Sequence, residues 1–179
     1  MTTRLPLASS CFQNISRVIL LDLRSERVEF RSAAQRDLPG VVFLAPDLLD
    51  DLEALAESLL HESLHHKMFD AWTLFPPLLG EAGEVRPPWK QEPPPAPVVT
   101  WPLDRAMGAA HVYSHLVAYA RAGWGDQARA PDRLLCSKAG ERAEYLLSSS
   151  LETPGLSPAG ERFCRWLHAA IQLRSQENP

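Results

Sequence analysis

The sequence predicts an α+β fold in which a small N-terminal antiparallel or mixed sheet precedes a mainly helical part. Two observations predict it. Short runs of β-branched and aliphatic residues fill residues 1–46, and from residue 47 onward apolar residues recur at helical spacing between caps and prolines. With 179 residues, 45% of them hydrophobic and 22% charged, the chain has a globular composition. We therefore expect residues 1–179 to form a single domain.

Three short strands are expected within residues 1–46. Val18–Leu23 is rich in β-branched and aliphatic residues, and Arg27–Ser32 alternates apolar with charged residues, so the two predict a hairpin. Val41–Leu44 predicts a third strand, because Pro39 and Gly40 mark a turn before it.

Residues 47–75 predict one long amphipathic helix. Its leucines recur at spacings of four, three and four residues, and Asp47 supplies an N-cap in an acidic first turn. Pro76 and Pro77 end it. The periodic leucines are Leu48, Leu52, Leu55 and Leu59.

A proline-rich loop over residues 76–102 separates this helix from a helical part over residues 103–179. The loop holds more than half of the 16 prolines, and a loop of this length is usually functional or disordered. Trp89 and Trp101 argue against plain disorder. A helix is expected from Asp104 to about Ala122, ended by Gly123-Trp124-Gly125. A fourth begins near Pro131, and a fifth has Ser157 as its N-cap and Pro158 as its first residue.

Charge and cysteine content exclude several classes of protein. The chain has 18 Lys and Arg against 22 Asp and Glu, so no electrostatic footprint for nucleic acid or an anionic membrane is present. Cys11, Cys136 and Cys164 are odd in number and lack CxxC spacing, which favours neither disulfides nor a thiolate zinc site. Because the apolar run Val18–Leu21 is too short for a signal peptide or a membrane span, we expect a cytoplasmic protein.

Residues 61–66 read His-Glu-Ser-Leu-His-His, an HExxH motif inside the long helix. A spacing of four residues places His61 and His65 on one helix face, where two imidazoles can bind one metal ion, as in zincin-like proteins. The alternative is a pair of surface or hydrogen-bonded histidines. His66 is expected beside the site or on the surface, not among the ligands.

A third protein ligand is expected on the following helix. His115 is our first candidate, His111 comes next, and Glu141 or Glu144 after it. Gly108-Ala109-Ala110 would let that helix approach another closely. Each histidine taken alone also fits a packed helix residue.

Basic and aromatic residues of the loop are candidates for binding small ligands. Arg86, Lys90 and Arg105 flank it, and Arg105 is the best anchor because it begins the helix that carries His111 and His115. Trp89 and Trp101 are candidates for the walls of the cleft. The alternatives are solvated cations and rings that clamp the loop onto the core.

Five segments in this order carry a resemblance to a known family. The chain resembles the HEXXH-motif peptide-modification proteins found beside ribosomally made peptide precursors, also described as 2-oxoglutarate-dependent HExxH peptide β-hydroxylases. An arginine-rich segment common in that family is replaced here by Gln91–Pro95. The five segments are Leu38–Leu44, Leu59–Lys67, Pro88–Lys90, His111–Leu116 and Leu156–Gly160.

The resemblance implies one catalytic domain that binds Fe(II) and 2-oxoglutarate and hydroxylates a side-chain β-carbon of a precursor peptide. His61, His65 and His115 would hold the iron, and Glu62 would be a nearby catalytic group or the carboxylate ligand that iron oxygenases usually have. The remaining predictions assign cofactor binding to Arg105 and Lys90, and substrate binding to Trp89, Trp101 and His111.

Two other functions use the same residues. In a zinc peptidase, Glu62 would act as general base on a zinc-bound water, although no third histidine follows six residues after His65. In a non-catalytic module, the motif would be degenerate and the N-terminal strands would capture a precursor peptide for a partner enzyme, although His61, Glu62 and His65 are intact. Both enzymes could pair an extended peptide with a sheet edge such as the strand near Val41.

Overall fold

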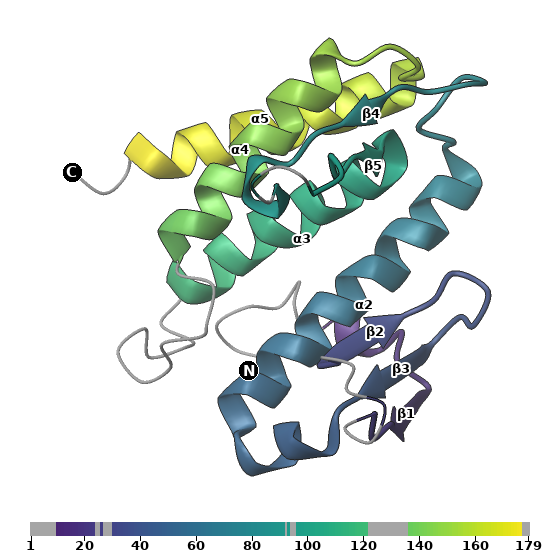
Figure 1. Ribbon diagram of the computed structural model, residues 1–179, viewed down its shortest axis with the longest axis vertical. Coiled ribbons are helices and arrows are strands. Elements are labelled where there is room, and N and C mark those ends of the chain that lie inside the picture. Colours follow the sequence, from purple (N-terminus) through teal and green to yellow (C-terminus); the bar gives the residue numbers. More distant parts are fainter. Residues whose placement is uncertain are drawn as a thin grey trace. The chain divides into compact units, whose positions relative to one another are not determined.

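The structure is a computed structural model that describes residues 10–23, 26, 30–91, 93, 96–121 and 136–176. It confirms the α+β class, with a small sheet near the N-terminus followed by helices (Figure 1). The chain divides into two compact units. Unit 1 comprises Met1–Ala71 with Ala118–Pro131, and unit 2 comprises Trp72–Val117 with Asp132–Pro179.

The sheet of unit 1 has three strands in the order β1-β3-β2. β1 (Arg17–Leu20) pairs in parallel with β3 (Val41–Leu44), and β2 (Ser32–Ala34) pairs with β3 in the antiparallel sense. The sheet is therefore mixed, and the predicted hairpin of the first two strands is wrong. The most apolar strand, β3, takes the central position, because only there are both of its edges paired.

The core of unit 1 lies on one face of β3. Val42 and Leu44 alternate with half-buried neighbours and are 0% and 1% exposed. Gly40 starts the strand with φ +75°, and a Cβ there would lie 2.7 Å from Ser16 Oγ, so both backbone angle and space require glycine. The residues packed with Val42 and Leu44 are Leu48, Ala54, Ile15, Leu55 and Leu59.

Helix α2 (Leu52–Leu74) follows a separate 3₁₀-helix η2 (Pro46–Asp50). Asp51 caps α2, since its Oδ1 accepts hydrogen bonds from the N–H groups of Glu53 and Ala54, both at 3.0 Å. The predicted cap at Asp47 is wrong. The predicted leucine stripe also fails, because it is split between two helices and leaves Leu52 78% exposed.

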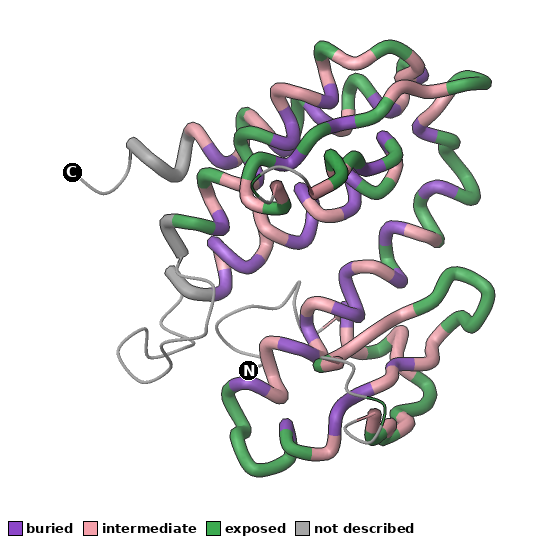
Figure 2. Tube along the Cα trace, viewed as in Figure 1, coloured by how far each residue is buried: buried purple, intermediate pink, exposed green. Residues whose placement is uncertain are grey.

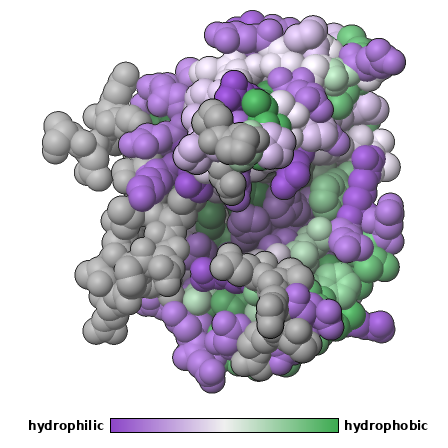
Figure 3. All heavy atoms as spheres, in the orientation of Figure 1, coloured by the Kyte–Doolittle hydropathy of each residue, from purple (hydrophilic) through white to green (hydrophobic). Residues whose placement is uncertain are grey.

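Figure 2 shows buried positions along the middle of α2 and exposed positions at both of its ends. Among the described residues, no helix is both long and apolar enough to cross a membrane. Figure 3 shows hydrophobic surface over the part of the molecule where Figure 1 draws the sheet. The edge strand β1 leaves Val18 and Leu20 exposed.

The described residues of unit 2 include the end of α2, most of α3, the helices α4 and α5, and a short antiparallel pair of strands. The helices after α2 are α3 (Leu103–Arg121, whose last residues belong to unit 1), α4 (Cys136–Glu152) and α5 (Pro158–Gln176). β4 (Glu84–Val85) pairs antiparallel with β5 (Trp101–Pro102), and the 3₁₀-helix η3 (Pro88–Lys90) lies between them in sequence.

The side chain of Gln91 bridges the two sides of the proline-rich loop. Gln91 donates from Nε2 to the carbonyls of Pro87 (2.9 Å) and Val99 (2.8 Å), and its Oε1 accepts from the Val99 N–H (3.2 Å). The segment that departs from the resembled family therefore includes the residue that ties the two sides of this loop together.

Of the two N-caps predicted at Ser157 and Asp104, the first is confirmed and the second is wrong. Ser157 caps α5 as predicted, because its Oγ accepts from the Gly160 N–H at 3.1 Å, and it also donates to the Pro76 carbonyl. Asp104 is not the cap of α3: it lies inside the first turn and accepts from the N–H of Arg105. Other predictions fall on residues outside the described ranges, namely Val28, Gly123–Gly125, Pro131 and the side chain of Cys136.

Candidate metal centre

His61 and His65 lie one turn apart on α2, as the motif predicts. Their Nε2 atoms are 3.2 Å apart, and the rings meet nearly edge to face with centroids 5.0 Å apart. With Glu62 they form a group whose ligand atoms all lie within 4.8 Å of one another. The helix alone therefore brings two imidazoles and a carboxylate to one place.

Both histidines are neutral at physiological pH. Burial lowers the pKa of His61 to about 4, and the positive charge of Arg31 adds to the effect. Burial also lowers the pKa of His65 to about 3, with contributions from His61 and His66. A metal ion binds the neutral imidazole, so protons do not compete for these ligands near pH 7.

Glu62 is buried, at 3% exposed, and β2 supplies its hydrogen bonds. Ser32 Oγ donates to Glu62 Oε1 at 2.6 Å, and the backbone N–H of Ala34 donates to the same carboxylate. Burial raises the pKa of Glu62 to about 7, and the bonds from Ser32 and Ala34 oppose that rise. The carboxyl group is therefore fixed in orientation and titrates near neutral pH.

The sheet edge beside the motif is β2, and not the strand near Val41. β3, which contains Val41, is paired on both sides by β1 and β2 and offers no free edge. That prediction is wrong because the central strand cannot accept a further partner. The carboxylate of Glu62 lies against the edge strand β2 through Ser32 and Ala34.

His66 connects α2 to the sheet. It is 3% exposed, and its Nε2 lies 3.0 Å from the carbonyl oxygen of Val41, to which it donates. The surface alternative predicted for His66 is therefore wrong. This residue supports the helix that carries the motif.

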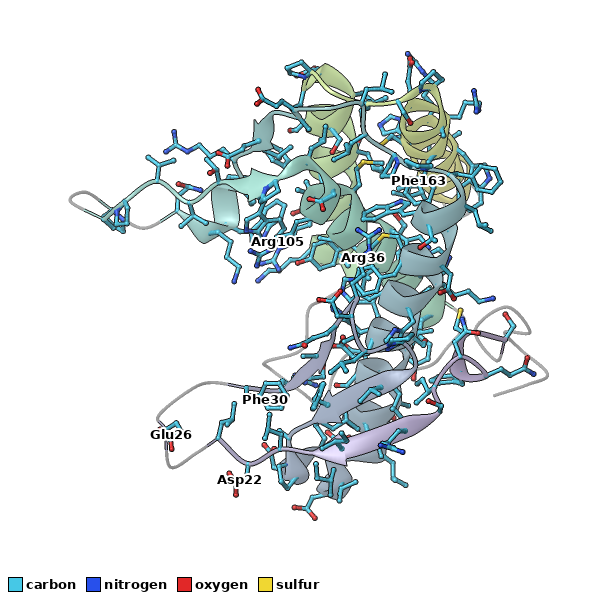
Figure 4. All side chains as sticks on the ribbon, turned by 90° about the vertical axis from the view of Figure 1, so that its right-hand side faces the viewer. Asp22, Glu26, Phe30, Arg36, Arg105 and Phe163 are labelled. Carbon is cyan, nitrogen blue, oxygen red and sulfur yellow. The ribbon has the colours of Figure 1, made fainter. Side chains whose placement is uncertain are left out.

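The candidates for a third ligand lie in unit 2. The ring of His115 is 4.4 Å from that of His111, and its Nδ1 donates to the His111 carbonyl at 2.9 Å. This bond leaves Nε2 as the nitrogen with a lone pair, which is the tautomer of a metal-binding histidine. His111 is buried and lies 5.7 Å from the ring of Phe163, labelled in Figure 4.

The acidic alternatives on α4 are exposed. Glu144 accepts a hydrogen bond from Gln172 Nε2 at 2.9 Å. Glu141, three residues earlier in α4, is also exposed. Among the residues that the structure describes, neither Glu141 nor Glu144 belongs to a group of three side chains that could hold a metal ion. Their role as ligands, like that of His115, stays a prediction.

Trp89 and Trp101 come together, and Arg105 joins them. The two indole centroids are 6.3 Å apart, and the guanidinium carbon of Arg105 lies 4.8 Å from the Trp101 ring. Lys90 ends η3 and is exposed. The Arg86 side chain is also exposed, while its carbonyl accepts from Tyr145 Oη at 2.7 Å.

Several residues of these sites are not found by sequence reasoning. Ser32 in β2 bonds Glu62, Arg31 just before it acts on His61 by its charge, and Arg142 and Tyr145 of α4 contact Trp89. These contacts join segments far apart in sequence, so no local spacing signals them. Tyr113 is the exception, since it lies between His111 and His115 in the helix already singled out.

The donor set fits a divalent transition metal. Two neutral imidazoles with a carboxylate are typical ligands of non-haem iron, and zinc accepts the same atoms. No protein-family model matches the sequence, and a search among curated proteins finds no match either.

Proposed function

We propose that the chain is a non-haem Fe(II)- and 2-oxoglutarate-dependent oxygenase that hydroxylates a side-chain β-carbon in a ribosomally made precursor peptide. The observation that carries the proposal is the group His61, Glu62 and His65, with all ligand atoms within 4.8 Å. Two histidines and one carboxylate make up the ligand set of many iron oxygenases. The order of sequence segments supports the peptide substrate.

In this proposal His61 and His65 hold the metal through neutral imidazoles, and Glu62 completes the ligand set. Ser32 and Ala34 keep the Glu62 carboxylate in one orientation. Bound Fe(II) together with 2-oxoglutarate supplies the oxidation of an unactivated C–H bond. Of the two cofactor-binding candidates from the sequence, Lys90 is kept in this role, because the Arg105 guanidinium lies 4.8 Å from the Trp101 ring among the substrate-binding candidates. Those candidates are Trp89, Trp101 and His111.

A zinc peptidase is the second candidate, and one observation favours it. The pKa of Glu62 is raised to about 7, which suits a general base that takes a proton from a metal-bound water. In that reaction His61 and His65 hold zinc, and the hydrogen bond from Ser32 orients Glu62.

The deciding experiment is anaerobic reconstitution with Fe(II), followed by 2-oxoglutarate, while the visible spectrum is recorded. A metal-to-ligand charge-transfer band that His61→Ala removes is expected. His168→Ala, on α5 and outside the motif, is the matched control and should keep the band. Tight zinc retention without a band would favour the peptidase, and then Glu62→Gln should lose turnover while keeping its metal.

A further inference from the structure

We propose that Arg105 and Arg142, each held over an indole ring, form a recognition site in unit 2 for an extended acidic segment of a peptide. The site is distinct in composition from the metal centre. It assigns Arg105 to a peptide carboxylate and not to a small cofactor, and it adds Arg142, which the sequence does not single out.

A cluster of aromatic rings forms the base of this site. The Trp89 ring lies at its centre, with centroid distances of 6.3 Å to Trp101, 6.4 Å to Tyr113 and 5.7 Å to Tyr145. All three pairs are close to perpendicular, with interplanar angles of 76–82°. Such edge-to-face packing fixes the orientation of each ring.

Each arginine is placed by these rings. The guanidinium carbon of Arg105 lies 4.8 Å from the Trp101 centroid, and that of Arg142 lies 5.0 Å from Trp89 and 5.9 Å from Tyr113. Figure 4 marks Arg105 at the start of α3. Stacking on a ring uses the flat face of a guanidinium and leaves its in-plane N–H donors for a carboxylate.

Neither arginine forms an ion pair with a carboxylate among the residues that the structure describes. Arg165 on α5 behaves differently, because Glu161 pairs with it at 2.6 Å. Lys90 and Arg86 add exposed positive charge from the adjoining loop. In a chain of net charge −4, Arg105 and Arg142 thus present two guanidinium groups over aromatic rings, and these groups are complementary to an anionic ligand.

The spacing of the two indoles fits an extended peptide. In a β-strand, side chains at positions i and i+2 point to the same side and are about 6.6 Å apart. The Trp89 and Trp101 centroids are separated by 6.3 Å. Acidic residues at alternate positions would therefore each meet one guanidinium, because Arg105 lies over Trp101 and Arg142 lies over Trp89.

That the ligand is a peptide rests on the proposed function, whereas its negative charge rests on the arginines alone. The test therefore measures binding by the full chain with no metal present and needs no turnover. A titration calorimeter follows the addition of a synthetic peptide of alternating glutamate and threonine. The matched peptide has glutamine in place of each glutamate.

The glutamate peptide should bind about tenfold more tightly than the glutamine peptide. Arg105→Gln with Arg142→Gln should remove that preference, while Arg165→Gln, a matched exposed arginine, should keep it. Arg142→Lys should retain part of the binding, since the charge remains, and the folded state of every variant is checked by circular dichroism. The emission of Trp89 and Trp101 should change on binding, which gives a second measurement.

Equal affinity for both peptides would overturn the proposal, as would an equal loss in Arg165→Gln. Binding of 2-oxoglutarate alone, abolished by Arg105→Gln, would also overturn it. The charge-transfer experiment is separate, so a bound peptide without an iron band would leave this site standing and refute only the oxygenase.

Discussion

Glu62→Gln tests how strongly the fold disfavours a charged carboxylate in the motif. Glu62 is 3% exposed, and burial raises its pKa from 4.5 to about 7. Glutamine has nearly the same shape, cannot ionise, and keeps an acceptor oxygen for Ser32. The substitution therefore removes the titration of residue 62, and any change in its bonds to Ser32 and Ala34 adds an offset that does not depend on pH.

The sign follows from the direction of the pKa shift. Because the folded protein binds this proton more tightly than the unfolded chain, the stabilising contribution is complete below pH 4.5 and is lost as the pH rises through about 7. A rise from 4.5 to about 7 corresponds to about 3 kcal/mol. His61 and His65 act in the opposite sense, since their lowered pKa values add stability as the pH rises toward 6.5.

The assay is urea unfolding of both proteins with a chelator present, at about pH 4.5 and about pH 8.5. The histidines are common to both proteins, so their contribution cancels in the comparison. Glu62→Gln should gain about 3 kcal/mol over the wild type between the two pH values. A difference in unfolding free energy that does not change with pH would refute the reasoning. Ser32→Ala should enlarge the pH dependence, because it removes a bond that lowers the pKa of Glu62.

Further outcomes concern the metal and the loop. Zn(II) at about 100 times its dissociation constant should stabilise the protein by about 2.7 kcal/mol, raising Tm by about 5–10 °C in scanning calorimetry. His65→Ala should abolish the rise and His168→Ala should keep it. At about pH 6, metal binding should release close to one proton if Glu62 is a ligand, because Glu62 is then mostly protonated and the imidazoles are neutral. Calorimetry in buffers of different ionisation enthalpy measures this, and no release would remove Glu62 from the ligand set. Gln91→Ala loses three hydrogen bonds and should destabilise the protein by about 1–3 kcal/mol in urea unfolding, whereas an unchanged midpoint would show that the loop is held by its rings alone.

Features set by local geometry could be predicted from the sequence. The distance between His61 and His65 follows from four residues of helix, and the Ser157 cap follows from the residue type beside Pro158. The leucine periodicity predicted one continuous helix, which is wrong because η2 and α2 are separate helices. The spacing of the leucines gives no sign of the break at Asp51.

Features set by contacts between distant segments could not be predicted. Strand order depends on which strand gains most from two partners, and the sequence of β1 and β2 alone favours a hairpin. The bond from Ser32 to Glu62 spans 30 residues, and a serine in a short strand carries no signal of its partner. Arg142 likewise looks like an ordinary helix cation until the fold brings Trp89 to it.

Helix α2 buries polar side chains, and the small sheet supplies hydrogen-bond partners for them. Ser58, Glu62, Ser63 and His66 are all buried on this helix, and a buried polar group without a partner costs more than an apolar side chain would. The sheet provides two of the partners, since Ser32 bonds Glu62 and the Val41 carbonyl bonds His66. A helix packed only for stability would place leucine at such positions. The strands therefore satisfy polar groups that surround the two histidines, and these bonds fix the Glu62 carboxylate and the helix within the candidate metal centre.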